Sequence, residues 1–176
     1  GLSNSEVALA SALWSAKEIG VEIDHISLAE YFTEGKGMQN QQELDQKLRE
    51  ADGIIISTPV YFGDRGSLAQ SFITYLRNNK DLLEAIKHKV YAGISVGAKR
   101  NGGQETTLIY QLIDMINIGF LGVGNDSETT SQYGGTGLAG DIGTMSEDDY
   151  GLQTAMGTGR RVARVATMMS NAGQSS

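Results

Sequence analysis

Two adjacent aromatic residues, Tyr61 and Phe62, closely follow the only proline of the chain and precede a glycine. Aromatic rings on a short loop can lie against a flat ligand, and the fixed φ of proline gives such a loop a defined heading. We therefore predict a ligand-binding loop at the end of a buried strand. The alternative is a tight turn whose rings pack on the domain. The residues of this loop are Thr58, Pro59, Val60, Tyr61, Phe62 and Gly63.

A second segment, at the head of the first predicted helix, suits a phosphate group. Ser3, Asn4 and Ser5 bring short polar side chains to this position. The first turn of a helix also offers free backbone N–H groups and the positive end of the helix dipole, both of which favour an anion. An ordinary N-cap explains the same residues.

A third segment is rich in glycine, which lets the backbone approach a ligand closely. Lys99 and Arg100 add positive charge that suits a phosphate, whereas a solvated loop tip is the alternative. The predicted binding residues of this segment are Ser95, Val96, Gly97, Ala98, Lys99, Gly102, Gly103 and Gln104.

Other kinds of site have little support in the sequence. The chain contains no cysteine, so it has no thiolate nucleophile and no cysteine ligand for zinc or an iron–sulfur cluster. Its two histidines, His25 and His88, are far apart in the sequence and show no metal-binding spacing. We predict no metal site and assign no catalytic residue.

Helical and strand patterns alternate along the chain, which predicts a parallel sheet between two helix layers. Residues Gly53–Ile56 carry no polar side chain and predict a buried strand, and a glycine-rich loop is expected over 124–149. The other predicted strands are Val21–Ser27, His88–Val96 and Ile118–Val123, and the predicted helices are Ser5–Ile19, Gln41–Glu50, Ser67–Leu76, Glu105–Ile116 and Tyr150–Met169.

This order predicts a doubly wound α/β fold with a five-stranded sheet of order 2-1-3-4-5, but the first strand has no counterpart in the chain. In that order the first strand lies inside the sheet, and a sheet without an interior strand is not expected to be stable. We therefore expect a strand and the start of its loop to precede Gly1. A strand from another chain is a less favoured alternative.

Composition limits the class of protein further. The 176 residues suit a single domain, 1–176, with one core. A net charge of −7 and scattered basic residues argue against nucleic-acid binding. No apolar stretch approaches the roughly 20 residues of a membrane span. Because residue 1 is glycine, a removed targeting segment stays open, and cytoplasm is the default expectation.

Together, the three segments resemble the flavodoxin-like NAD(P)H-dependent FMN reductase and quinone reductase family. Residues 3–5 look like the end of its phosphate loop, and residues 58–63 resemble its Thr-Pro-x-Tyr-x-Gly flavin loop. Residues 102–106 are similar to its Gly-Gly-Gln-Glu run, and residues 133–140 look like its long final loop. The resemblance covers nearly the whole chain.

The resemblance implies FMN as cofactor and NAD(P)H as electron donor. Hydride would pass through FMN to a quinone, a flavin or another small acceptor, with Tyr61 and Phe62 along the isoalloxazine ring. A homodimer or homotetramer is also implied. The alternatives are a flavin-dependent tailoring oxidoreductase acting on one metabolite, a flavodoxin-like electron carrier, and a binding module without flavin.

Overall fold

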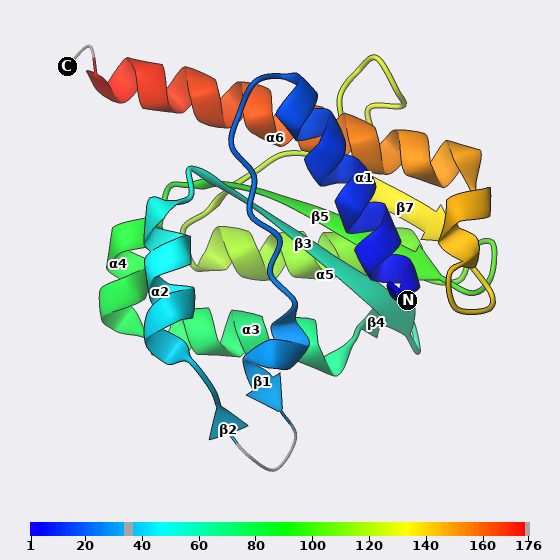
Figure 1. The fold of residues 1–176 in the computed structure, drawn as a ribbon, viewed down its shortest axis with the longest axis horizontal. Coiled ribbons are helices and arrows are strands. Elements are labelled where there is room, and N and C mark those ends of the chain that lie inside the picture. The colour runs from blue at the N-terminus through cyan, green and yellow to red at the C-terminus, as the bar shows by residue number, and fades with distance from the viewer. Residues whose placement is uncertain (34–36, 175–176) are drawn as a thin grey trace.

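A parallel sheet forms the centre of the computed structural model, which describes residues 1–33 and 37–174 (Figure 1). Strand β3 (Gly53–Tyr61) pairs with β5 (Val90–Gly97) over seven residues in parallel. The short strand β4 (Asp64–Arg65) turns back antiparallel onto the end of β3. On the far side of β5, β6 (Leu121–Gly122) pairs with its start and β7 (Gly134–Leu138) with its end, both in parallel.

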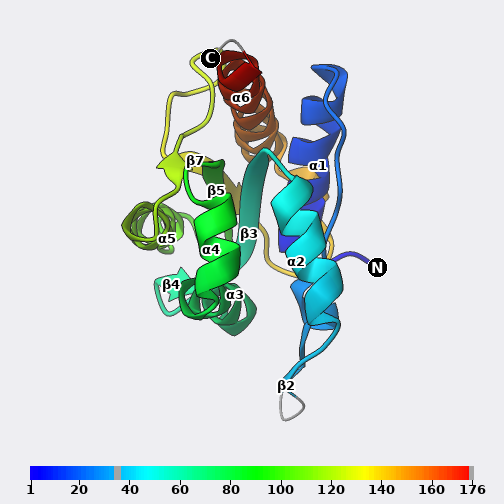
Figure 2. The same cartoon turned by 90° about the vertical axis from the view of Figure 1, so that its left-hand side faces the viewer.

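Helices cover both faces of this sheet, as the edge-on view shows (Figure 2). Helices α1 (Asn4–Glu18) and α6 (Asp149–Gln174) pack together on one face. The other face carries α3 (Ser67–Asn78), α4 (Lys80–Ile86) and α5 (Gln104–Asn117), with α2 (Gln41–Glu50) packed on α4. The predicted three-layer α/β/α architecture is therefore confirmed.

The alternation of strand side chains divides the core between the two faces. Ile54 and Ile56 of β3 join the large cluster under α2, α3 and α4. Ile94 of β5 packs instead with Ala8 and Ala12 of α1. The small alanines let α1 lie close to the sheet, so its first turn ends up beside the carboxyl ends of β3 and β5. This position is what brings the candidate site together.

The predicted strand Val21–Ser27 is wrong, because no strand forms over these residues. The segment runs from α1 to the short 3-10 helix η1 (Leu28–Glu30), and a small antiparallel pair follows between β1 (Phe32–Thr33) and β2 (Gly37–Met38). The physical reason is the lack of a neighbour. A strand needs a paired strand for its backbone hydrogen bonds, and a cavity separates this segment from β3.

The predicted last strand and long loop also need correction. Of Ile118–Val123 only Leu121 and Gly122 form a strand, and β7 lies inside the expected loop 124–149. Glycine is a poor strand former, so Gly134 and Gly135 gave no strand signal. They are required by packing: a Cβ at Gly134 would stand 2.2 Å from the carbonyl oxygen of Gly93.

Two local predictions were also inexact. Strand β3 continues through Thr58–Tyr61, so only Phe62 and Gly63 form the turn to β4. Proline has no backbone N–H to donate. Pro59 is tolerated in the strand because the backbone groups of this residue point away from β5. Helix α3 begins at Ser67 as predicted, with Gly66 as its N-cap, but ends at Asn78 rather than Leu76. None of the described helices is long and apolar enough to cross a membrane.

Candidate functional site

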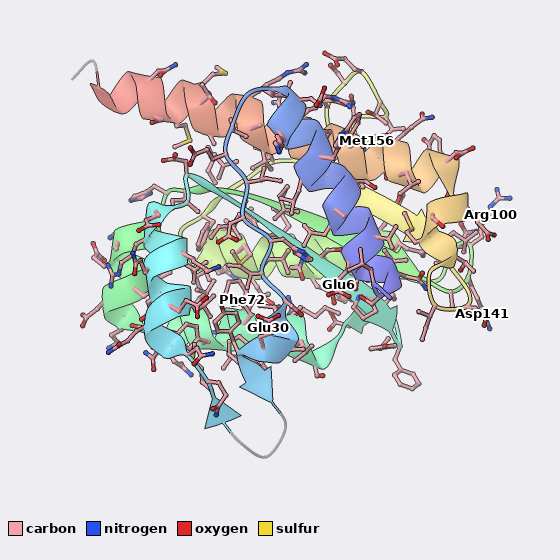
Figure 3. The ribbon with its side chains drawn as sticks, in the orientation of Figure 1. Glu6, Glu30, Phe72, Arg100, Asp141 and Met156 are labelled. Atoms are coloured by element: carbon pink, nitrogen blue, oxygen red, sulfur yellow. The ribbon has the colours of Figure 1, made fainter. Side chains whose placement is uncertain are left out.

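The three predicted binding segments meet at the carboxyl edge of the sheet. Thr58 lies opposite Ser95 in the β3–β5 register, so the two strands end side by side. The Ser57 hydroxyl donates to the Ser5 carbonyl oxygen at 2.8 Å, which places the start of α1 beside the same edge. Figure 3 shows Glu6 of α1 at this end of the molecule, with Arg100 and Asp141 on neighbouring loops. The three predicted segments thus lie beside one another at this edge, although Thr58, Ser95 and Val96 are buried beneath it.

The aromatic pair projects from this edge into solvent. Tyr61 is 61% exposed and Phe62 is fully exposed, so neither ring belongs to the core. Phe62 has a φ of 54° and Gly63 a φ of 80°, which together make the tight turn from β3 to β4. A left-handed φ is uncommon for a bulky residue, so the turn holds the Phe62 ring outward at some conformational cost. The packed-turn alternative for these two aromatics is therefore wrong.

Buried polar contacts fix the glycine-rich loop from beneath. The Gln104 amide nitrogen donates to the Lys99 carbonyl oxygen at 2.9 Å, and its oxygen accepts from the Gly102 N–H at 2.9 Å. The hydroxyl of the fully buried Ser95 donates to the Gln104 carbonyl oxygen. Ala98, Lys99 and Arg100 are exposed above this frame. Ser95 and Gln104 therefore shape the loop with their side chains.

The glycine-rich loop and the aromatic loop touch each other. Gly103 has a φ of 104°, and a Cβ there would stand 2.7 Å from the Gly63 Cα. Glycine is required at 103 for both reasons. Below the contact, the Thr58 hydroxyl accepts from the Gly66 N–H at 2.9 Å. The two loops consequently form one rigid rim.

A complete capping box closes the start of α1. The Ser3 hydroxyl accepts from the Glu6 N–H, and the Glu6 carboxylate accepts from the Ser3 N–H at 2.8 Å. The hydrogen bond from the Ser3 hydroxyl is the main reason that the pKa of Glu6 lies below its ordinary value. Ser3 and Ser5 are both at the surface of this turn, with their hydroxyl oxygens 3.3 Å apart. The N-cap is thus established, and an additional phosphate contact stays a prediction.

Asn4 has a structural role that the sequence did not reveal. Its side-chain nitrogen donates to the Asp141 carbonyl oxygen at 2.8 Å, and its side-chain oxygen accepts from the Met145 N–H at 3.1 Å. Both partners lie more than 130 residues away, in the loop between β7 and α6 that contains the 3-10 helix η2 (Thr144–Glu147). A link between such distant residues leaves no local sequence signal. Asn4 thereby fastens the final loop to the start of α1.

Asp148 is a second residue whose role appears only in the structure. One carboxylate oxygen accepts from the Gly151 N–H at 3.0 Å, and the other accepts from the Leu138 N–H at 2.7 Å. The contact with Gly151 satisfies a free donor in the first turn of α6. The contact with Leu138 holds the end of β7. Asp148 thus links the start of α6 to the end of β7.

The fold and the position of the site define a flavodoxin-like α/β protein with a ligand site beyond the carboxyl ends of its strands. A family comparison narrows this class. Residues 2–127 match the family described as NADPH-dependent FMN reductase. The chain belongs to this family, and membership implies FMN as its cofactor.

Named relatives agree with this assignment. An iron-sulfur flavoprotein of Methanocaldococcus jannaschii is 35% identical over 94% of this chain and 92% of its own length. An NAD(P)H dehydrogenase (quinone) of Methylocella silvestris is 29% identical over 86% of this chain and 85% of its own. A solved WrbA-like flavodoxin from Agrobacterium tumefaciens has a TM-score of 0.65 at 24% identity, covering 92% of this chain and 89% of that one. This last likeness confirms the fold.

The name of the Methanocaldococcus jannaschii relative includes an iron–sulfur cluster, and such clusters are held by cysteine thiolates. The 176 residues contain no cysteine, so a cysteine-ligated cluster has no ligand among them. Flavin chemistry needs no such ligand.

The residues present at the site fit FMN. Two exposed aromatic rings suit the flat ring system, and two hydroxyl-bearing residues at the start of α1 suit a phosphate. A Cβ placed on Gly63 of the aromatic loop, or on Gly140 or Gly143 of the loop between β7 and α6, would meet no atom within 4 Å, so space is open beside the backbone at these positions. The exposed cations Lys99 and Arg100 suit an anionic group.

Proposed function

We propose that this flavin oxidoreductase binds FMN across the rim and transfers hydride from NAD(P)H to a quinone, a flavin or another small acceptor. The observation that carries the proposal is the meeting of the three predicted segments at one sheet edge, one of which carries two exposed aromatics. When bound, FMN accepts a hydride at its flavin ring and passes the electrons to the acceptor. The protein's own residues hold and orient the reactants.

Each segment has a distinct part in this proposal. Tyr61 and Phe62 lie along the flavin ring, and the backbone of residues 97–103 faces its polar edge. Ser3 and Ser5 bind the phosphate at the positive end of the α1 dipole. Gln104 and Asn4 keep the two loops in place through the contacts described above.

Lys99 and Arg100 are proposed to attract the phosphates of the nicotinamide donor. Both are exposed at the tip of the glycine-rich loop, and the chain as a whole carries a net charge of −7. A local positive tip on an acidic protein favours the approach of an anionic donor at this edge rather than elsewhere.

Flavin binding and reduction test the proposal directly. The protein is titrated into FMN, whose fluorescence falls on binding, and the complex is then mixed with NADH or NADPH without oxygen. We expect binding, bleaching of the flavin absorbance, and steady turnover with a simple quinone. No binding of FMN contradicts the proposal. Binding without steady NAD(P)H oxidation indicates an electron carrier, and turnover on one metabolite only indicates a tailoring oxidoreductase.

A pair of variants tests the aromatic contact. Tyr61→Ala is expected to weaken FMN binding about fivefold, because an aromatic stacking contact contributes about 1 kcal/mol. Trp14→Ala is the matched control, since Trp14 is also exposed, at 58%, but lies on α1 away from its start. Equal effects from the two substitutions contradict the proposed contact.

The outer face of α5 supports the expected homodimer or homotetramer. Tyr110, Ile113 and Ile116 are 48%, 51% and 53% exposed along this helix. We propose that this face joins copies of the chain, because three large apolar side chains at helical spacing form an uncharged strip. Ile113→Glu is expected to lower the mass measured by light scattering to that of a monomer, and an unchanged mass contradicts this face.

A further inference from the structure

A buried arginine follows the aromatic turn of the candidate site. Strand β4 is only two residues long, with Asp64 opposite Tyr61 and Arg65 opposite Val60. A hairpin this short is marginal on its own. Phe62 nevertheless keeps a left-handed φ of 54°, a conformation that persists only where the surroundings fix the backbone. Contacts beyond the β3–β4 pairing must therefore hold the turn.

The Arg65 side chain supplies such contacts to two different helices. Its Nε donates to the Gln70 side-chain oxygen of α3 at 2.8 Å, and its Nη2 donates to the Asp114 carboxylate of α5. Only 8% of the Arg65 side chain is exposed. Figure 2 shows α3, β4 and α5 on the same face of the sheet. The planar guanidinium thus joins the end of the turn to both helices at once.

Stability alone does not account for a charge at this position. Among the described residues, Nη1 of Arg65 has no hydrogen-bond partner, and neither has the buried hydroxyl of Tyr91 or the side-chain oxygen of Gln111. Burying a charge and leaving polar atoms unpaired both cost free energy. Apolar side chains of similar size often replace a buried ion pair without loss of stability. What Arg65 adds over an apolar side chain is a directional link from the turn to the helices.

We propose that Arg65 is a positioning residue for the flavin: it holds residues 61–64 in the shape that FMN meets, without touching FMN itself. A turn that is fixed before binding needs no ordering when the ligand arrives, and this raises affinity. The Arg65 guanidinium contacts α3 and α5, whereas the Tyr61 and Phe62 rings are exposed. The inference rests on the proposed function for its ligand, but the fixed turn exists without FMN.

Two double variants test the proposal. Arg65→Met with Asp114→Asn removes both charges and roughly keeps the volumes, so no uncompensated buried charge remains. Arg160→Met with Asp126→Asn is the matched control, because Arg160 donates to the Asp126 carboxylate at 2.7 Å and the Asp126 side chain is 3% exposed. This second pair joins the loop between β6 and β7 to α6, and neither residue belongs to the three segments of the site.

Chymotrypsin cleavage without flavin measures how firmly the turn is held. The protease cuts after aromatic residues, and its rate at Tyr61 and Phe62 follows the population in which the turn is open. Mass spectrometry of the fragments identifies the cut. We expect roughly tenfold faster cleavage at the turn in the Arg65 double variant and the parent rate in the control variant. Thermal unfolding of both should show similar losses in Tm.

FMN affinity is the second measurement. The Arg65 double variant is expected to bind FMN about tenfold more weakly than the parent, and the control variant is expected to bind it equally well. Arg65→Lys serves if the double variant does not fold, because it keeps the charge but cannot reach α3 and α5 with one planar group. It should weaken FMN binding roughly threefold and speed cleavage by a similar factor.

Parent-like cleavage or parent-like FMN affinity in the Arg65 double variant overturns the proposal, because the effect would not pass through the turn. Equal loosening of the turn in the two double variants also overturns it, since the cause would be a general loss of stability. A parent-like Arg65→Lys variant would show that charge suffices and that the link to two helices does not matter. If the parent itself binds no FMN, the proposed function fails, and the cleavage rates alone decide whether Arg65 fixes the turn.

Discussion

Strands β3 and β5 are parallel neighbours of similar apolar character, yet only β5 is buried along its whole length. β5 has paired strands on both edges: β3 on one side, and β6 followed by β7 on the other. Within the part of the chain that the structure describes, Gly53–Pro59 of β3 pairs with a strand on one side only. Its residues alternate between buried and half-buried because alternate side chains point to opposite faces of the sheet. An apolar run therefore predicts a strand, but its lateral neighbours decide how completely the strand is enclosed.

The largest expected difference between the two strands comes from removing a large side chain in each. Ile94→Ala in β5 is expected to lower the free energy of unfolding by about 3 kcal/mol, because Ile94 is fully buried. Ile55→Ala in β3 should cost only about 1 kcal/mol, because Ile55 is half-buried beside the cavity. Urea unfolding of both variants measures the difference, and equal losses contradict the comparison.

Separating β7 from β5 should leave the second half of β5 with a paired strand on one side only, as in β3. Gly134→Ala places a methyl group 2.2 Å from the Gly93 carbonyl oxygen, and the overpacking is expected to cost about 2 kcal/mol. Amide exchange along the second half of β5 should also become faster. Gly140→Ala is the matched control, since a Cβ at that position meets no atom within 4 Å. Comparable losses in both variants would show that contact with β5 is not the cause.

Asn4 connects the two regions, because it joins α1, beside the open edge of β3, to the loop that follows β7. Asn4→Ala removes hydrogen bonds to the Asp141 carbonyl oxygen and the Met145 N–H. We expect a loss of about 1 kcal/mol and weaker FMN binding. Asn117→Ala, an exposed position at the end of α5, is the control. Unchanged stability and flavin affinity in the Asn4 variant would contradict this connecting role.

The smallest expected effect concerns the capping box that Ser3 and Glu6 form at the start of α1. The pKa of Glu6 is lower in the folded chain than its ordinary value of 4.5, chiefly because of the hydrogen bond with the Ser3 hydroxyl. A lowered pKa stabilises the fold at pH values above the ordinary one, and the gain is lost as pH falls through the folded value.

Glu6→Gln should therefore be less stable than the parent at about pH 7, and the two should converge at about pH 3. Urea unfolding at both pH values checks this expectation. A difference that is the same at the two pH values would show that the ionised carboxylate is not what stabilises the start of α1.

Much of the candidate site was predictable because the local backbone geometry requires particular residue types there. Only a residue without a side chain fits Gly103 at a φ of 104°, and an exposed aromatic pair after a proline has few structural explanations. The links made by Asn4 and Asp148 to distant backbone groups were not predictable. Their partners are brought close by the packing of whole elements, and a hydrogen bond across the chain imposes no spacing on the sequence.

The sequence by itself determined the alternation of helices and strands, the flavodoxin-like class and the three segments that border the site. Hydrophobic period, proline and glycine act over a few residues, so they can be recognised in the chain. Only the tertiary structure decided that a run of glycines forms β7 and that residues 21–27 form no strand. A strand exists only through hydrogen bonds to a neighbour, and the neighbour is chosen by the fold.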